Sequence, residues 1–270
     1  MEYILTIFYG IIEGITEWLP VSSTGHIILM KEFFPLEAFK TENFFSLFEI
    51  IIQLGAILAV IVIYFNKLFP FKIKDKFKID KDIFTMWFKI LVSCIPCIFI
   101  VLLGLDDKFE ELFYNKFSVS IALIIVGIMF IIIESFKKES KINSLKEITF
   151  KNAFIIGLFQ LIAALFPGVS RSGITIIGAL TLGISRNIAA EYTFFLAIPA
   201  MLGASLMKLV KIGLNFSSNE IIILLLGTII SFITSIIIIK FLMNYIKKHD
   251  FKIFGYYRIL LGIVILLFFL

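Results

Sequence analysis

The sequence predicts an all-α polytopic membrane protein with six transmembrane helices and two re-entrant helical hairpins in an inverted-topology repeat. Three observations lead there: an apolar composition, long uninterrupted apolar runs, and two runs broken by proline, glycine and serine. The chain has 270 residues, of which 60% are hydrophobic and 17% charged, and its mean hydropathy is +1.04. One soluble core cannot hide that much apolar surface. We therefore expect a single integral membrane domain over residues 1–270.

Six apolar runs approach the roughly 20 residues that cross about 30 Å of hydrocarbon. They are Phe44–Asn66, Thr85–Gly104, Phe117–Phe136, Ile188–Gly213, Glu220–Met243 and Ile253–Leu270. The start of the chain has no basic stretch typical of a secretory signal, so the first segment is expected to belong to the mature fold. Cys94 and Cys97 lie inside the second run, where packing thiols are expected rather than a redox pair.

The loops between these runs alternate in charge, and this alternation predicts the topology. Residues 67–85 carry six lysines, residues 106–111 are acidic, residues 137–151 are basic, and residues 213–219 have no charge. The last loop is assigned Lys247, Lys248, Lys252 and Arg258. The positive-inside rule places the three basic loops in the cytoplasm and both termini outside. Lysines spread over loops also indicate contact with anionic lipid headgroups, and no nucleic-acid partner is expected.

Two further segments do not fit as simple spans. Tyr3–Phe34 is interrupted at Leu19–His26, and Asn152–Ile184 is interrupted at Phe166–Gly173. Proline and glycine end one short helix, and serine or threonine can cap the next. Each segment is therefore predicted to be a re-entrant hairpin, which is permitted at membrane depth where protein or water satisfies its loop.

The two predicted hairpins also resemble each other. After one extra residue is allowed in the second loop, the matches are Gly10 with Gly157, Glu13 with Gln160, Pro20 with Pro167, Ser22 with Ser170, and Gly25 with Gly173. Three crossings separate the hairpins, so the second enters from the opposite face. This pattern predicts an inverted repeat, with repeat 1 at about 1–136 and repeat 2 at about 152–270, joined by a cytoplasmic basic loop. The broken segments of such repeats meet near the membrane midplane.

Glu13 and Glu17 are the first candidate functional residues, because they lie four apart on one face of the first half-helix. A carboxylate near the bilayer centre costs about 2.5–3.5 kcal/mol on insertion scales. Two such groups together require a cation, a shared proton or a positive partner. A functional pair is expected here rather than a helix end reaching the interface.

The return helix of the first hairpin opens with Ser22, Ser23 and Thr24. One of them is expected to cap the helix, and the free backbone N–H groups and the positive dipole end make an anion site. His26 lies one turn beyond Ser23 and is expected to carry a proton or to act as a nucleophile.

Arg171, flanked by Ser170 and Ser172 in the second loop, is the other costly residue. A planar guanidinium suits two phosphate oxygens at once. In the empty protein it is expected to pair with Glu13 or Glu17, which a substrate can displace. Thr175 adds a hydroxyl further along the helix.

Glu49 and Gln53 form a third polar pair, four apart on the first full span. They either support the site or lie at the interface, and Glu191 is a candidate counterpart of Glu49 in the second repeat. Carboxylates, hydroxyls, a histidine and an arginine together suit phosphoryl transfer. No Walker loop is present, so a phosphate presented by a lipid is expected rather than ATP.

At these residues the sequence resembles the bacterial undecaprenyl-diphosphate phosphatase family of the bacitracin-resistance type. Glu13–His26 is similar to the E-x-x-x-E motif of the family and its serine–histidine segment, and Pro167–Thr175 is similar to the P-G-x-S-R-S-x-x-T motif. Phe48–Gly55 resembles the corresponding stretch as well. The similarity extends over essentially the whole chain.

The resemblance implies hydrolysis of undecaprenyl diphosphate to undecaprenyl phosphate and inorganic phosphate, which recycles the carrier for peptidoglycan synthesis and confers bacitracin resistance. It also implies dependence on a divalent cation, Mg²⁺ or Ca²⁺. The implied location is the bacterial inner membrane, with the site facing the outer side. The expected partners are the lipid substrate and the phospholipid bilayer, with a homodimer as a further option.

Residue roles follow from the same resemblance. Glu13 and Glu17 correspond to essential carboxylates that act through the metal, and Arg171 holds the diphosphate. Ser23 is the expected nucleophile and His26 serves it, with direct attack by the histidine left open. The hydroxyls expected around the substrate are Ser22, Thr24, Ser170, Ser172 and Thr175.

Two other classes of function compete with this interpretation. Inverted repeats with broken helices are typical of transporters, so a flippase for an anionic prenyl phosphate lipid is the main alternative. A passive scaffold for cell-wall enzymes is the third, but it leaves the intramembrane charges without a purpose.

Overall fold

The computed structural model describes residues 2–34, 42–74, 76–136, 139–212 and 216–268, and these are predominantly helical. Two segments are broken helices: α1 (Glu2–Thr16) with α2 (Ser23–Phe33), and α8 (Phe150–Leu165) with α9 (Arg171–Thr181). The long helices are α3 (Glu42–Ile63), α5 (Lys81–Leu102), α7 (Lys116–Ser135), α10 (Arg186–Ile212), α11 (Ser218–Tyr245) and α12 (Lys252–Phe268). Short elements are α4 (Phe65–Leu68), α6 (Leu105–Phe113) and the 3₁₀ turn η2 (Leu145–Glu147).

Five of the described helices are long and apolar enough to cross a membrane: α3, α5, α7, α10 and α11. They correspond to the first five apolar runs of the sequence. The sixth run corresponds to α12, which has 17 described residues and is therefore shorter than a usual span. The multi-pass helical architecture is thus confirmed.

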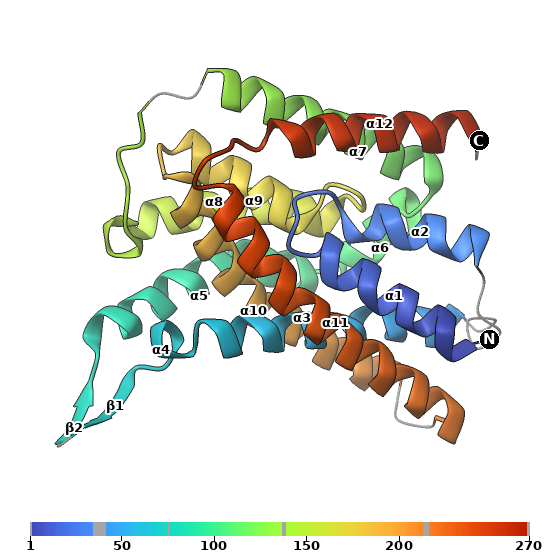
Figure 1. Cartoon of the computed structure of the whole chain (residues 1–270), viewed down its shortest axis with the longest axis horizontal. Coiled ribbons are helices and arrows are strands. Elements are labelled where there is room, and N and C mark those ends of the chain that lie inside the picture. The colour runs from blue at the N-terminus through green and yellow to red at the C-terminus, as the bar shows by residue number, and fades with distance from the viewer. Residues whose placement is uncertain (1, 35–41, 75, 137–138, 213–215, 269–270) are drawn as a thin grey trace.

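The all-α fold class is confirmed, and one short element of the described residues departs from it. Residues 71–79, in the first basic loop, form an antiparallel hairpin of β1 (Phe71–Lys74) and β2 (Lys76–Ile79). Lysine alternates here with phenylalanine and isoleucine, and a period of two favours a strand over a helix. In Figure 1 the hairpin projects from the end of the molecule opposite to both chain termini.

The packing contacts of the helices in the first half of the chain are repeated by the equivalent helices of the second half. Helix α1 packs along α11, and α8 packs in the same way along α5, while α7 and α12 pack along each other (Figure 1). Helix α3 contacts both α11 and α10. Exchanging α1 with α8, α3 with α10, α5 with α11 and α7 with α12 reproduces these contacts.

Small residues allow the helix backbones to approach closely, as is typical of membrane helices. A Cβ added at Gly55 would lie 2.1 Å from the carbonyl oxygen of Thr228 on α11. A Cβ at Gly157 on α8 would lie 2.4 Å from the carbonyl oxygen of Ser93 on α5. Side chains at these contacts would separate the helices that hold the two broken segments in place.

Candidate functional site

The loops of the two broken helices share one unusual backbone conformation. Ser22 has φ 75° and ψ 102°, and Ser170 has φ 71° and ψ 113°. They are the non-glycine residues with positive φ within the described part of the chain. Each caps the following helix, since the side chain of Ser22 accepts from the N–H of Gly25 and that of Ser170 from Gly173. Such strain costs about 1–3 kcal/mol and marks functional sites.

The tips of the two broken helices meet at Glu17. Arg171 Nη2 donates to Glu17 Oε1 at 2.7 Å, and Ser23 Oγ donates to Glu17 Oε2 at 3.0 Å. Ser172 Oγ donates to the backbone oxygen of Glu17 at 3.0 Å. The predicted ion pair of Arg171 therefore forms with Glu17, and it is largely buried, with side-chain exposures of 15% and 9%. The structure brings a cation, a carboxylate and a hydroxyl into one chain of hydrogen bonds.

Helix α10 completes the environment of Arg171. Arg171 Nη1 donates to the backbone oxygen of Thr193 at 2.8 Å. The guanidinium carbon of Arg171 lies 5.8 Å from the ring centre of Trp18. Thr175 Oγ1 lies 3.1 Å from Thr193 Oγ1. Thr193 and Trp18 were not among the sequence-predicted site residues. Trp18 follows Glu17 directly, but Thr193 carries no local signal.

Glu13 is fully buried, and both of its carboxylate oxygens are without a hydrogen-bond partner among the described residues. The charged groups that act on the Glu13 carboxylate are Glu17, Glu49 and Arg171. A buried carboxylate without a donor is chemically suited to a hard divalent cation. No group of three histidine, cysteine or acidic side chains gathers at one point in the described residues. A cation held here would therefore need water or phosphate oxygens as further ligands.

His26 lies close to Ser23 in sequence but has other partners. Its Nδ1 lies 2.7 Å from the backbone oxygen of Ser22, and its Nε2 lies 2.7 Å from the hydroxyl of Tyr257. The rings of His26 and Tyr257 are stacked, with centres 5.6 Å apart and planes 4° apart. The hydroxyl of Ser23 is instead bonded to Glu17. Tyr257, on α12, is a neighbour of the site that the sequence did not indicate.

The assignment of Arg258 to the last basic loop is wrong. It lies within α12 and is fully buried. Its Nη2 donates to the backbone oxygens of Gly168 at 3.0 Å and Val169 at 2.9 Å, and its Nη1 donates to that of Pro20 at 3.3 Å. One guanidinium therefore joins the loops of both broken helices. Its position inside an apolar run is the signal that could have identified it.

The remaining predicted residues lie on α2, on α3, at the start of α9 and on α10. Glu49 Oε1 accepts a hydrogen bond from the hydroxyl of Tyr114 at 3.0 Å, and Gln53 is half-buried one turn further along α3. Thr24 is half-buried in the first turn of α2. Ser170 Oγ lies 3.2 Å from Ser172 Oγ. Glu191, the proposed counterpart of Glu49, pairs with Lys67 at 2.7 Å.

The fold and the site together define a polytopic membrane protein with a buried polar site between two broken helices. The chain belongs to the bacitracin resistance protein BacA family, whose model matches residues 6–264. It is 58% identical to undecaprenyl-diphosphatase 1 of Clostridium acetobutylicum, over 100% of this chain and 98% of the relative. It is 55% identical to an undecaprenyl-diphosphatase of Desulfitobacterium hafniense, over 100% and 96% respectively. A third relative, the undecaprenyl-diphosphatase of Acetivibrio thermocellus, is 53% identical over 100% and 98%. The family expected from the motifs is confirmed.

Proposed function

We propose that this protein hydrolyses undecaprenyl diphosphate to undecaprenyl phosphate and inorganic phosphate. This reaction returns the carrier lipid to peptidoglycan synthesis and confers bacitracin resistance. Membership of the BacA family and the names of full-length relatives support the proposal. The observation that carries it is the buried chain from Arg171 through Glu17 to Ser23, which combines a phosphate-binding cation with a hydroxyl beside a carboxylate.

The bond that breaks is the P–O bond between the terminal phosphorus and the bridging oxygen of the diphosphate. Ser23 Oγ attacks the terminal phosphorus, and Glu17 accepts the proton that Ser23 already donates to it. The lipid monophosphate leaves, and water then cleaves the phosphoserine to release inorganic phosphate. Arg171 moves from Glu17 to the transferring phosphoryl group and neutralises its charge. The hydroxyls of Ser170, Ser172 and Thr175 belong to the same loop as Arg171 and to the first turns of α9.

Glu13 and Glu17 are the residues that would hold a divalent cation, Mg²⁺ or Ca²⁺. The unpaired oxygens of Glu13 fit this role. When bound, such a cation polarises the phosphoryl oxygens and offsets their charge. A Glu13→Gln variant removes one negative ligand, so the concentration of Mg²⁺ needed for half-maximal phosphate release is expected to rise. An unchanged metal requirement would contradict this assignment.

We further propose that the chain has six spans and two re-entrant hairpins in an inverted repeat, with both termini outside the inner membrane and the site facing the outer side. The positions of the termini and the basic hairpin at opposite ends of the molecule support this topology (Figure 1). So do the matching backbone conformations of Ser22 and Ser170. Cysteine labelling of Lys67→Cys and Lys141→Cys variants in intact cells tests it. Accessibility of these two sites from opposite sides would exclude the model.

The activity is tested by phosphate release from a C55 diphosphate by the purified protein in detergent. Glu17→Gln and Arg171→Ala each remove one half of the buried ion pair and are expected to lose most of the activity. Lys247→Gln, an exposed loop change, is the matched control and should retain it. Near-normal rates for both site variants would refute the proposal.

The identity of the nucleophile is tested with the same assay. Because Ser23, and not His26, is bonded to Glu17, a phosphoenzyme trapped during turnover should vanish in Ser23→Ala and persist in His26→Ala. Loss in His26→Ala alone would assign the attack to the histidine.

Equivalent helices in the two halves of the chain make equivalent packing contacts, as in the internal repeats of transporters. This symmetry also favours a second candidate, a flippase for an anionic prenyl phosphate lipid. Translocation of the lipid by a hydrolysis-inactive Ser23→Ala protein in vesicles would support transport. Phosphate release without any gradient supports the enzyme.

A further inference from the structure

Glu49 is a third carboxylate close to the buried polar site. Tyr9 on α1 and Phe48 on α3 are in edge-to-face contact, with ring centres 5.8 Å apart. Glu13 lies one turn beyond Tyr9 on α1, and Glu49 follows Phe48 directly on α3. The charge of Glu49 acts on both Glu13 and Tyr9. The contact between α1 and α3 therefore brings the two carboxylates near each other.

The carboxylate of Glu17, in contrast, already has a partner on each oxygen. Its Oε1 accepts from Arg171 at 2.7 Å, and its Oε2 accepts from Ser23 at 3.0 Å. A cation bound to Glu17 in this arrangement would lie beside the guanidinium, and two positive charges repel strongly where little water screens them. The oxygens of Glu13 have no hydrogen-bond partner among the described residues. As long as Arg171 is bonded to Glu17, the carboxylate that is open to a cation is therefore that of Glu13.

The hydrogen bond that Glu49 accepts comes from a neutral group. The hydroxyl of Tyr114 donates to Glu49 Oε1 at 3.0 Å. The charges that act on Glu49 are the negative Glu110 and the positive Lys31 and Lys208. A tyrosine hydroxyl is uncharged at neutral pH, so it does not repel a cation that approaches the same carboxylate. Glu49 can therefore exchange this hydroxyl for a cation without any movement of Arg171.

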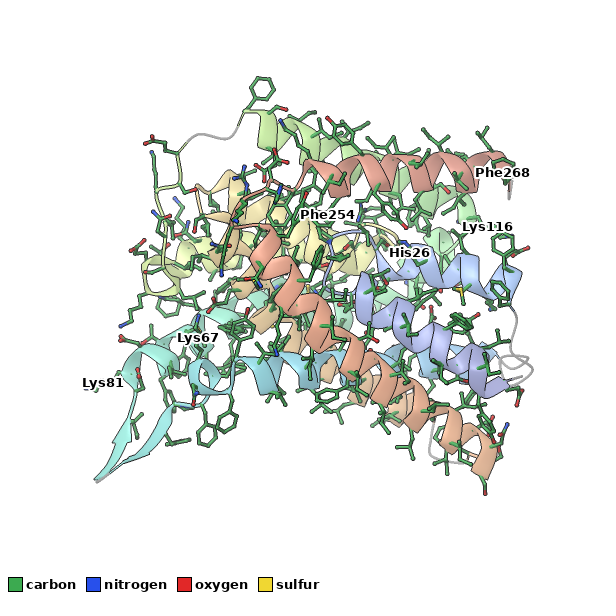
Figure 2. All side chains as sticks on the ribbon, in the orientation of Figure 1. His26, Lys67, Lys81, Lys116, Phe254 and Phe268 are labelled. Carbon is green, nitrogen blue, oxygen red and sulfur yellow. The ribbon has the colours of Figure 1, made fainter. Side chains whose placement is uncertain are left out.

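Helix α6 lies at the end of the molecule that is proposed to face outside. The next helix begins at Lys116, which lies opposite to Lys67 and Lys81 of the first basic loop (Figure 2). Helix α6 carries the acidic residues Asp106, Asp107, Glu110 and Glu111. Negative charge of this kind raises the local concentration of cations. Glu49 is half-buried and bonded to the residue that follows α6, so a cation from this surface reaches Glu49 before the fully buried Glu13.

We propose that Glu13 and Glu49 together bind a divalent cation before the substrate arrives. The cation displaces the hydroxyl of Tyr114 from Glu49. Two carboxylates match the charge of a hard divalent cation such as Mg²⁺, Ca²⁺ or Mn²⁺, and water supplies the remaining oxygen ligands. Glu17 joins the cation only after a phosphate has taken Arg171, and this last step rests on the proposed function.

Binding of Mn²⁺ to the purified full chain in detergent, without any substrate, tests the proposal. Electron paramagnetic resonance measures free Mn²⁺ and so gives the Kd and the number of sites, and one site per chain is expected. Glu49→Gln keeps the size of the side chain and removes its charge, so the Kd should rise at least about tenfold. The matched control is Glu139→Gln, which removes the same charge from an exposed loop position and should keep the native Kd.

Two further variants separate the role of Glu49 from that of Glu17. Glu17→Gln/Arg171→Met removes the buried ion pair without changing the net charge, and it should bind Mn²⁺ as the native chain does. Tyr114→Phe removes the hydroxyl that competes for Glu49, so it should bind Mn²⁺ about fivefold more tightly. A purely structural role of Tyr114 would give weaker binding instead.

A native Kd in Glu49→Gln would overturn the proposal, and so would weaker binding in Tyr114→Phe. Loss of Mn²⁺ binding in the Glu17→Gln/Arg171→Met chain would overturn it as well, because Glu17 would then be a ligand before the substrate arrives. Absence of any Mn²⁺ site in the native chain without substrate would have the same consequence. Phosphate release from the C55 diphosphate remains the separate test of the proposed function, so the two can fail independently.

Discussion

Arg258 offers a sharp test of how the two broken helices are held together. In Arg258→Met the side chain keeps much of its length and its apolar character, but the three backbone oxygens of Pro20, Gly168 and Val169 lose their donor. A buried acceptor left unpaired costs about 1–3 kcal/mol. The three together reach roughly 3–9 kcal/mol, from which the relieved desolvation of the guanidinium must be subtracted. A net destabilisation of about 3 kcal/mol is therefore expected.

The same substitution removes the contacts that hold the two loop tips in a fixed position relative to each other. Glu17 belongs to one loop region and Arg171 to the other, so their 2.7 Å contact depends on the relative position of the two loops. A displacement of about 1 Å at a catalytic site costs roughly 100-fold in rate. Phosphate release from the C55 diphosphate should accordingly show a kcat about 100-fold lower. The KM should change less, because Arg258 contacts the loops and leaves the proposed phosphate contacts of Arg171 in place.

Arg258→Lys is the informative companion. A single ammonium can reach one or two of the three carbonyl oxygens, so an intermediate thermal stability in detergent and an intermediate kcat are expected. Tyr257→Phe, at the neighbouring position, tests whether the effect is specific to Arg258, since it removes only the hydroxyl bonded to His26. If Arg258→Met has the same melting temperature and the same kcat as the unsubstituted protein, the proposed role of Arg258 in joining the loops is refuted.

Three other changes test a close helix contact, a buried ion pair and the role of the two cysteines. Gly55→Ala should destabilise the protein by about 1–3 kcal/mol in thermal unfolding, because its Cβ would overlap the α11 backbone; an unchanged melting temperature would contradict that close approach. Glu134→Ala should lower stability by about 2 kcal/mol, because both of its oxygens accept hydrogen bonds from Arg186; full stability in detergent would show that this ion pair is unimportant. Cys94→Ala/Cys97→Ala should retain phosphate release under oxidising and reducing conditions, because both thiols are free and one is buried; loss of activity would point to a redox role.

The features that the sequence predicted correctly depend on local chemistry. Apolar runs of span length must lie in lipid, and proline, glycine and serine at Leu19–His26 and Phe166–Gly173 must break the helix. The ion pair of Arg171 with one of two glutamates also followed, because a guanidinium in hydrocarbon requires an anion close by. The β-hairpin could have been read from its alternation of lysine with apolar residues, but the count of charges in that loop masked the period of two.

The sequence by itself determined the membrane class, the two broken helices and the charged residues at their tips, since each of these follows from the composition of a single segment. Only the tertiary structure decided that Ser23 is bonded to Glu17 while His26 is bonded to Tyr257, and that Arg258 joins both loops. These contacts connect residues more than 200 positions apart in two cases, His26 with Tyr257 and Pro20 with Arg258. The partners of His26 and Pro20 are fixed by where α12, which packs along α7, places Tyr257 and Arg258, and no periodicity within one segment encodes that arrangement.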